Sequence, residues 1–173
     1  MTVFVFQAKS SPEEWEATGR MMFERAHYTQ AASCFDKAQR FGDRNMSRAF
    51  QLRKDAREAA ADATRSALFK SAAHAFKSCA EAESEGTGGR RSLHRLAGEC
   101  FLDYQEYGPA GAQFELAGAL TEAASCFHKA QLLEDTARLV RPPDGSESLV
   151  EESVRDRILD SINLQYLRAN DLE

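Results

Sequence analysis

Residues 29–43 read TQAASCFDKAQRFGD, and residues 121–135 repeat this stretch as TEAASCFHKAQLLED. Ten of the fifteen positions are identical. Agreement at this level is not expected by chance in a chain of 173 residues, so the chain contains an internal repeat. Both copies are rich in residues that favour helices, and neither contains proline. The repeat therefore predicts a fold built from similar helical units.

A finer pattern of alternating large and small side chains occurs four times, at offsets 0, 3, 7 and 10. Its copies are Tyr28, Ala31, Phe35 and Ala38; Phe69, Ala72, Phe76 and Cys79; Tyr107, Ala110, Phe114 and Ala117; and Leu120, Ala123, Phe127 and Ala130. Such offsets lie on one face of an α-helix, where a small residue lets a neighbouring helix approach and a large one fills its groove. The copies start 41, 38 and 13 residues apart. We therefore expect an all-α fold, an irregular α-solenoid of helical hairpins.

Capping and breaking residues indicate where the helices begin and end. Ser11, Pro12 and Glu14 supply an N-cap, a first-turn proline and a capping box, and Gly42 is expected to end the second helix. The expected helices span about residues 12–25, 28–42, 45–62, 65–84, 92–105, 109–118, 121–132, 134–140 and 147–168.

The same signals divide the chain into four parts. Residues 1–10 are expected to form an extended arm or the end of a preceding domain, and residues 11–140 the helical-repeat domain. Residues 141–146 are a linker, and residues 147–173 a C-terminal capping helix. The apolar face of that helix consists of Val150, Val154, Ile158, Ile162 and Tyr166. A detachable docking helix is the alternative interpretation of the same pattern.

Composition narrows the classes of partner. The net charge of −5 disfavours a nucleic-acid-binding domain, because such domains are usually basic. No apolar run approaches the roughly 18 residues that span a bilayer, and the first ten residues lack the features of a secretory signal, so we expect no membrane partner. The cysteines stand singly within helical patterns, as Cys34, Cys79, Cys100 and Cys126. Unclustered cysteines of this kind indicate core residues in a reducing, cytoplasmic or nuclear environment.

The first hairpin resembles a tetratricopeptide repeat. The residues that carry the resemblance are Trp15, Gly19, Tyr28, Ala31, Phe35 and Ala38, and a later pair repeats most of them with Gly98, Phe101, Tyr107, Ala110, Phe114 and Ala117. The resemblance implies stacked helical hairpins that bind other proteins. The middle hairpin lacks the tryptophan and glycine of this pattern, so the resemblance implies an irregular stack.

A narrower resemblance rests on the order of three segments. They are SSPEEWEATGRMMFERAHYTQAASCFDKAQ at residues 10–39, AFQLRKDAREAA at residues 49–60 and LHRLAGECFLDYQEYGPAGAQFELAGALTEAASCF at residues 93–127. This order is similar to the helical-repeat region after the helicase module of large, UvrD-like, tetratricopeptide-and-ankyrin-repeat-containing proteins, many of them fungal. The resemblance implies a piece of a larger protein whose ATPase lies outside this chain.

Signals of enzymatic chemistry are weak. The four histidines are isolated, and none has the HExxH spacing of a zinc site. The glycine-rich residues 85–89 lack the spacing of a phosphate-binding loop, and no strand is expected before them. We therefore expect no enzyme, no catalytic residue, no cofactor and no metal.

Two binding functions remain from the sequence. The first function is binding of a protein or peptide, or of a neighbouring domain of the same parent chain. The exposed face of the first helix of each hairpin would form the binding surface. Its expected contact residues are Glu16, Arg20, Glu24, Arg48, Gln51, Arg95, Glu99 and Asp103. The alternative is a nucleic acid that follows basic residues of the middle hairpin and its flanks, namely Arg40, Arg44, Arg48, Arg53, Lys54, Arg57 and Arg65, with Arg90, Arg91 and Arg95. Interleaved acidic residues favour the first function, because they can pair with these cations.

Overall fold

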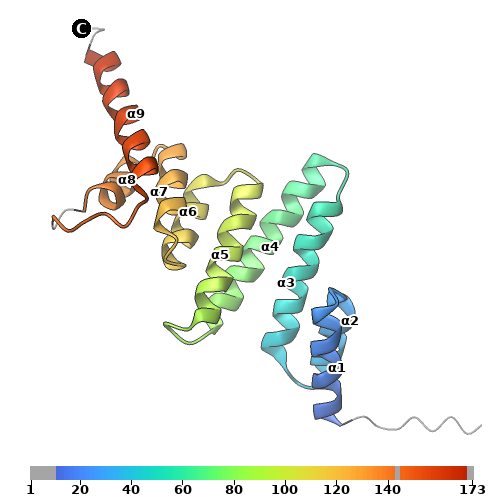
Figure 1. The fold of residues 1–173 in the computed structure, drawn as a ribbon. Coiled ribbons are helices and arrows are strands. Elements are labelled where there is room, and N and C mark those ends of the chain that lie inside the picture. Colours follow the sequence, from blue (N-terminus) through green and yellow to red (C-terminus); the bar gives the residue numbers. More distant parts are fainter. Residues whose placement is uncertain (1–10, 143–144, 171–173) are drawn as a thin grey trace, which may run out of the picture.

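The computed structural model describes residues 11–142 and 145–170, with backbone only for residues 165–170, and this part of the chain is all-α, as the sequence predicts (Figure 1). The helices are α1 (Pro12–Glu24), α2 (Tyr28–Lys37), α3 (Phe41–Glu58), α4 (Asp62–Ala82), α5 (Gly88–Asp103), α6 (Tyr107–Leu116), α7 (Leu120–Lys129), α8 (Leu133–Val140) and α9 (Glu152–Asn170). The arm expected at residues 1–10 and the side chain of Tyr166 lie outside the described residues.

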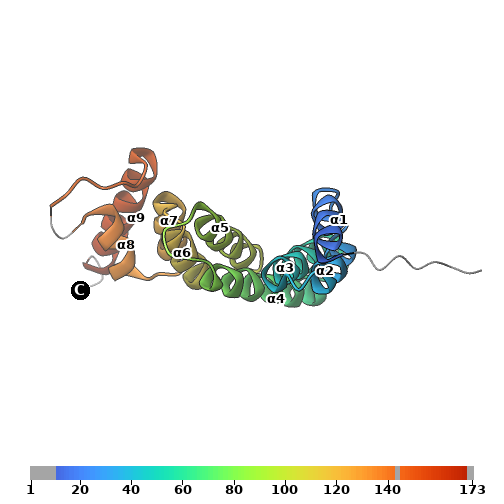
Figure 2. The same ribbon diagram turned by 90° about the horizontal axis from the view of Figure 1, so that it is seen from below.

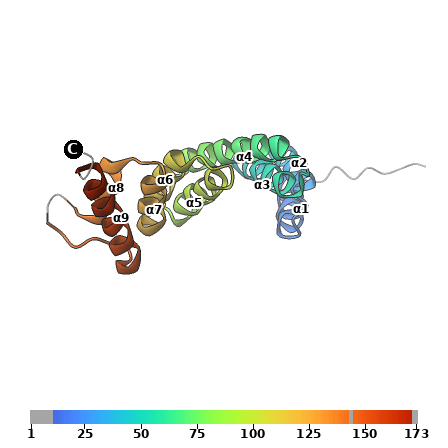
Figure 3. The ribbon, with the colours of Figure 1, turned by 90° about the horizontal axis from the view of Figure 1, so that it is seen from above.

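The helices pack in chain order. Each helix from α1 to α7 contacts the next one, and α9 contacts α7 and α8. Figures 1 and 2 show an elongated stack with α1 at one end and α9 at the other. Seen from above, α4 and α6 lie along one edge of the stack and α5 and α7 along the other (Figure 3). Packing between chain neighbours is typical of helical-repeat proteins. The finer expectation of a tetratricopeptide-like solenoid stays a prediction.

Five of the connections between helices are the same short turn. The first residue of each turn has a positive φ; these residues are Ala26 (57°), Gln39 (59°), Gln105 (67°), Gly118 (76°) and Gln131 (59°). The next residue donates its backbone N–H to a carbonyl five positions earlier, as Arg40 does to Phe35 at 2.8 Å. This is the Schellman closure of a helix. Because the five turns share this backbone geometry, the chain changes direction in a similar way from each helix to the next.

Phenylalanine rings pack on glycines across three of these turns. The pairs are Gly19 with Phe35, Gly98 with Phe114 and Gly111 with Phe127. A Cβ placed on the glycine would lie 2.9, 3.1 and 2.7 Å from the ring, respectively. Each ring follows its glycine by sixteen residues. We call these contacts glycine–phenylalanine locks, because only a residue without a side chain lets the ring approach so closely.

Helix α6 takes part in two locks. Its Phe114 packs on Gly98 of α5, and its Gly111 receives Phe127 of α7. It is therefore the second helix of one pair and the first helix of the next. This overlap explains why the last two copies of the sequence pattern start only thirteen residues apart.

Most of the predicted repeat positions lie in the core. The buried members are Gly19, Ala31, Phe35, Ala38, Phe69, Ala72, Phe76, Gly98, Ala110, Phe114, Ala123 and Phe127. The half-buried members are Trp15, Tyr28, Ala117, Tyr107 and Ala130. The Lys37 ammonium lies 3.9 Å from the centre of the Trp15 ring, which shields this ring from water. The alternation of large and small side chains therefore corresponds to the contact faces of the helices.

Several expected helix boundaries are wrong. Gly42 does not end the second helix, because Gln39 adopts the left-handed conformation and α3 has already begun at Phe41. The helix expected from residue 92 begins at Gly88, where the Thr87 hydroxyl accepts a hydrogen bond from the Arg90 N–H at 3.2 Å. Two of the five residues of the glycine-rich stretch, Gly88 and Gly89, are thus helical.

The last helix also starts later than expected, at Glu152 instead of residue 147. Before it, the Ser148 hydroxyl donates to the Leu139 carbonyl at 2.7 Å, and the Glu151 N–H donates to the Thr121 hydroxyl at 3.0 Å. Val150 is buried in this connection, and Ile158 is buried on the helix itself. The connection therefore fastens α9 to the end of the stack before the helix begins.

Candidate functional site

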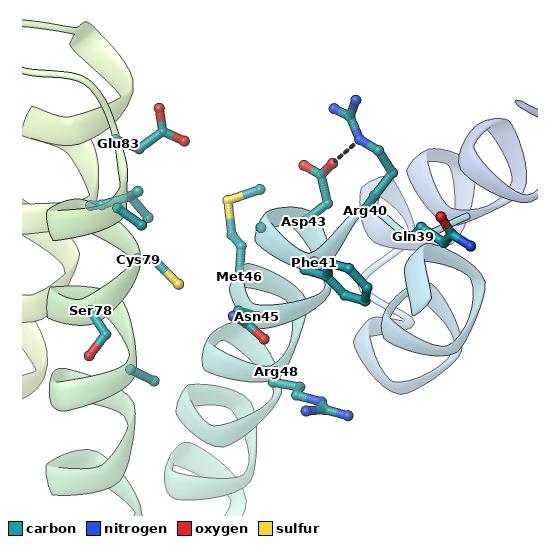
Figure 4. Close-up of a pocket in the computed structure, with 14 residues that line it drawn as sticks. Gln39, Arg40, Phe41, Asp43, Asn45, Met46, Arg48, Ser78, Cys79 and Glu83 are labelled. Atoms are coloured by element: carbon teal, nitrogen blue, oxygen red, sulfur yellow. Dashed lines mark hydrogen bonds and ion pairs between the residues drawn. The ribbon is translucent and has the colours of Figure 1, made fainter. Parts of the chain in front are cut away.

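Two hollows flank α3 and meet at Arg48. The first, about 620 Å³, lies between the first half of α3 and the second half of α4 (Figure 4), and we call it the cleft. The second, about 470 Å³, lies between α2 and α3, and we call it the socket. Arg48 lines both. We call the two hollows together the α3 groove; they lie along α3, on the sides that face α4 and α2.

The cleft combines an apolar lining with a charged rim. Met46 of α3 and Cys79 of α4 are half-buried. Phe41, the first residue of α3, is 55% exposed although its side chain is large and apolar. At the rim, the Arg40 guanidinium donates to the Asp43 carboxylate at 2.9 Å, which is the contact drawn in Figure 4. In Figure 4 the Phe41 ring lies on the side of α3 that faces away from α4, and the Arg44 guanidinium lies 5.0 Å from the centre of this ring. Exposed and half-buried apolar atoms are a surface that a partner can cover at low cost in desolvation.

The socket is lined mostly by polar side chains that already have partners. The Thr29 hydroxyl donates to the Gln51 amide oxygen at 3.1 Å, and the Gln51 amide nitrogen donates to Asp55 at 2.7 Å. Asp36 accepts from Arg44 at 2.7 Å. Arg48 differs from them, because its exposed guanidinium forms no ion pair or side-chain hydrogen bond within residues 11–142 and 145–170. It is therefore available to bind an anion from outside.

A row of contacts joins the first helices of successive pairs. The Phe23 and Phe50 rings meet edge to face at 5.2 Å between their centres, which connects α1 to α3. Arg53 of α3 pairs with Glu99 of α5. Arg95 of α5 pairs in turn with Glu122 of α7 at 3.0 Å. These charges hold the stack together, so they are less available to a partner.

The expected contact residues lie in three groups, one each on α1, α3 and α5. Glu16 and Arg20 pair with each other on α1, near the exposed Glu24. Arg48 and Gln51 lie in the α3 groove. The third group lies on α5, where Arg95 and Glu99 belong to the row of contacts just described and Asp103 follows on the same helix.

Asp103 lies beside the cations of α3. Partial burial raises the pKa of its carboxyl group, an effect that the nearby Arg53 and Arg57 oppose. The charge of Asp103 therefore interacts with cations of this chain.

Sequence reasoning missed Phe41 and the cleft. Phe41 stands thirteen residues after Tyr28, at the first residue of its helix, as Tyr28 and Tyr107 also do. That spacing could have identified it. Nothing in the sequence marks Met46 and Cys79 as neighbours, because they meet only when α3 and α4 pack with a gap between their ends.

Half of the ten cations expected to follow a phosphate backbone are paired with carboxylates. These are Arg40, Arg44, Arg53, Arg65 and Arg95. In the described part of the chain, the cations without such a pair are Arg48, Lys54, Arg57, Arg90 and Arg91. Lys54 and Arg57 line a small hollow of about 290 Å³ with the rings of Tyr28 and Phe50, and Glu58 reduces its positive charge. A long basic track for a phosphate backbone is therefore not formed by these residues.

Three of the thiols, those of Cys34, Cys100 and Cys126, and the imidazole of His94 are buried in the helix packing. Burial raises the pKa of the Cys100 thiol to about 12 and also raises the pKa of the Cys79 and Cys126 thiols, so little thiolate forms at neutral pH. His94 is buried and donates from Nδ1 to the Gln113 amide oxygen at 2.9 Å.

Among the described residues, no three His, Cys, Asp or Glu side chains gather as a metal site would require. None of the described helices combines the length and apolarity needed to cross a membrane.

The chain matches no family model, no curated protein and no solved structure. The resemblances to tetratricopeptide repeats and to the helicase-associated region therefore rest on the quoted residues alone.

Proposed function

We propose that this chain is a protein-interaction module and that the α3 groove binds a peptide segment of its partner. The observation that carries the proposal is the exposed guanidinium of Arg48, which lies between the two hollows and has no anionic partner among the described residues. The cleft offers apolar area next to it, including the exposed Phe41. Recognition sites commonly combine apolar lining with a few polar groups that fix orientation.

The partner suggested by this chemistry is a peptide with an apolar side chain and a carboxylate. An apolar side chain would cover the ring of Phe41 and the lining of the cleft. A carboxylate would pair with Arg48, which a guanidinium can do through two parallel hydrogen bonds. The peptide can belong to another protein or to a neighbouring domain of the same parent chain. In this proposal the module has no catalytic role and works in the cytoplasm or nucleus, as an associated part of a larger helicase-like protein.

Nucleic-acid binding is the weaker proposal. The pairing of Arg40, Arg44, Arg53, Arg65 and Arg95 with carboxylates weakens the attraction of this surface for a phosphate backbone. We expect no binding of a single-stranded oligonucleotide at physiological salt, as measured by fluorescence anisotropy. Binding that strengthens steeply as the salt concentration falls would favour this alternative.

Selection from a random peptide library displayed on phage tests the proposal. We expect the folded chain to enrich peptides that contain an apolar and an acidic residue. Bound peptide should also slow the reaction of Cys79 with a maleimide, because this thiol lines the cleft. A selection that enriches no sequence above a heat-unfolded control, or peptides that leave Cys79 labelling unchanged, would contradict binding in the α3 groove.

A further inference from the structure

The α2–α3 junction has the same turn as four other junctions, but it carries an arginine where three of them carry phenylalanine and one carries valine. In the described chain, the five turns all place a left-handed residue before a 6→1 hydrogen bond. Across three of them a phenylalanine packs on the glycine sixteen residues earlier. At the α7–α8 junction the same spacing relates Ala124 to Val140, and both are buried. At the α2–α3 junction it relates Ala32 to Arg48.

Arg48 does not close its junction as the apolar residues do. Its side chain is exposed, whereas Phe35, Phe114, Phe127 and Val140 are each at most 4% exposed. The socket of about 470 Å³ lies at this place, and both Ala32 and Arg48 line it. The socket therefore lies at the sequence position where the equivalent junctions bury a core side chain.

We propose that the socket takes an aromatic side chain from the partner peptide and that Arg48 binds a carboxylate next to that side chain. The inference rests on the proposed function and names the chemistry of its ligand. The choice of an aromatic side chain follows from the three junctions where a phenyl ring stands at the position that corresponds to Arg48. The acidic part follows from charge complementarity, because Arg48 stands at the rim without an anion while Asp36 is already paired with Arg44.

A dipeptide titration tests the ligand chemistry directly. The probe is acetyl-Phe-Asp-amide, added to the ¹⁵N-labelled full chain while amide chemical shifts are recorded. We expect saturable shifts at Thr29, Ala32 and Ser33, which line the socket. Acetyl-Ala-Asp-amide should bind about tenfold more weakly or not at all, because a phenyl group contributes at least that much when it is buried. Acetyl-Phe-Asn-amide should bind several-fold more weakly.

Shifts confined to other helices, or equal responses to the three dipeptides, would overturn the proposal. Shifts of the same amides that depend on protein concentration alone would assign the socket to a second copy of the chain and would also overturn it.

A second experiment fills the socket from within. In the double variant Ala32→Gly/Arg48→Phe, the junction regains the glycine and the phenylalanine of the other locks. We expect its Tm to exceed that of the single variant Ala32→Gly, which controls for the cost of a glycine in a helix. The response to acetyl-Phe-Asp-amide should disappear. A Tm no higher than that of Ala32→Gly, or an unchanged response to the dipeptide, would show that the space is not a vacant aromatic site.

The same double variant separates this inference from the proposed function. Library peptides that bind the double variant as tightly as the native chain would support a protein-interaction module. The same result would overturn the proposal that the socket is the aromatic site of that module. A library that yields no peptide for the native chain would contradict both.

Discussion

Gly111 illustrates how single residues set the distance between helices. A Cβ at this position would lie 2.7 Å from the Phe127 ring, so α6 and α7 would have to separate. We expect Gly111→Ala to lower the free energy of unfolding by about 1–3 kcal/mol, the usual cost of overpacking. The measurement is urea denaturation followed by circular dichroism.

Gly42 provides a matched control for this substitution. It also lies in a helix, α3, but a Cβ there would meet no atom within 4 Å. Gly42→Ala should therefore raise the free energy of unfolding by up to about 1 kcal/mol, through helix propensity alone. Equal effects of the two substitutions would mean that the lock is not a close contact.

The left-handed turn residues support a second prediction. Gly118 has a φ of 76°, whereas the equivalent Gln131 holds a φ of 59° with a side chain. Gly118→Ala should destabilise the chain by roughly 1 kcal/mol, since a Cβ is disfavoured at positive φ. Gln131→Gly should stabilise it by a smaller amount, because the entropy of glycine in the unfolded chain offsets part of the gain. Thermal unfolding of the two variants checks this, and a stabilising Gly118→Ala would contradict the turn geometry.

The cysteines differ in their expected reactivity. Cys79 is half-buried in the cleft, whereas Cys34, Cys100 and Cys126 are buried. At pH 8 we expect iodoacetamide to modify Cys79 first, at a rate that rises with pH, because burial raises the pKa of this thiol and little thiolate forms at lower pH. Mass spectrometry of the alkylated chain identifies the site. Modification of Cys100 ahead of Cys79 in the native chain would contradict the packing of α5.

At the scale of helices, the ion pair between Arg53 and Glu99 joins α3 to α5. The Arg53 side chain is only 12% exposed, so removal of Glu99 leaves a largely buried cation without its partner. We expect Glu99→Ala to cost about 1–3 kcal/mol, the penalty for an unsatisfied buried polar group. Glu81→Ala, which removes a surface pair with Lys77, should cost less than about 0.5 kcal/mol. Equal losses in chemical denaturation would show that the α3–α5 pair is no more than a surface contact.

Helices were more predictable than their ends. The offsets of three, four and seven residues identify the packed faces, because a helix repeats its faces locally. Gly42 was misread as a cap since glycine is the usual left-handed residue, whereas four of the five turns place alanine or glutamine there. The start of α9 depends on hydrogen bonds from Ser148 and Glu151 to other helices, which sequence periodicity does not contain.

The candidate site was predictable in part, for a related reason. Arg48 and Gln51 follow from the exposed face of α3. Helix geometry likewise places Glu99 and Arg95 on the exposed face of α5. In the structure, however, Glu99 pairs with Arg53, which lies 46 positions away in the sequence, and Arg95 pairs with Glu122, which lies 27 positions away. Which charges a fold uses internally depends on such distant contacts, so helix geometry alone overestimates the binding surface.

At the scale of the whole molecule, each helix is held mainly by its neighbours in the chain. A stack of this kind tolerates a junction without a glycine–phenylalanine lock, because the packing on either side of that junction forms separately. The α2–α3 junction lies between the α1–α2 lock and the long α3–α4 pair, so its open socket is supported on both sides. This arrangement lets one repeat position serve binding while the others serve stability.

The central claim, that the α3 groove binds a peptide through Arg48, is tested most directly by the affinity of a library-selected, fluorescein-labelled peptide. Its fluorescence anisotropy is measured against the native chain, Arg48→Gln and Arg91→Gln. Arg91 is the matched control, because it is exposed, has no ion pair among the described residues and lies outside both hollows. We predict that Arg48→Gln raises the Kd about tenfold or more, as loss of a charge-assisted pair would, and that Arg91→Gln leaves it unchanged. Equal Kd values for the three proteins would contradict the claim.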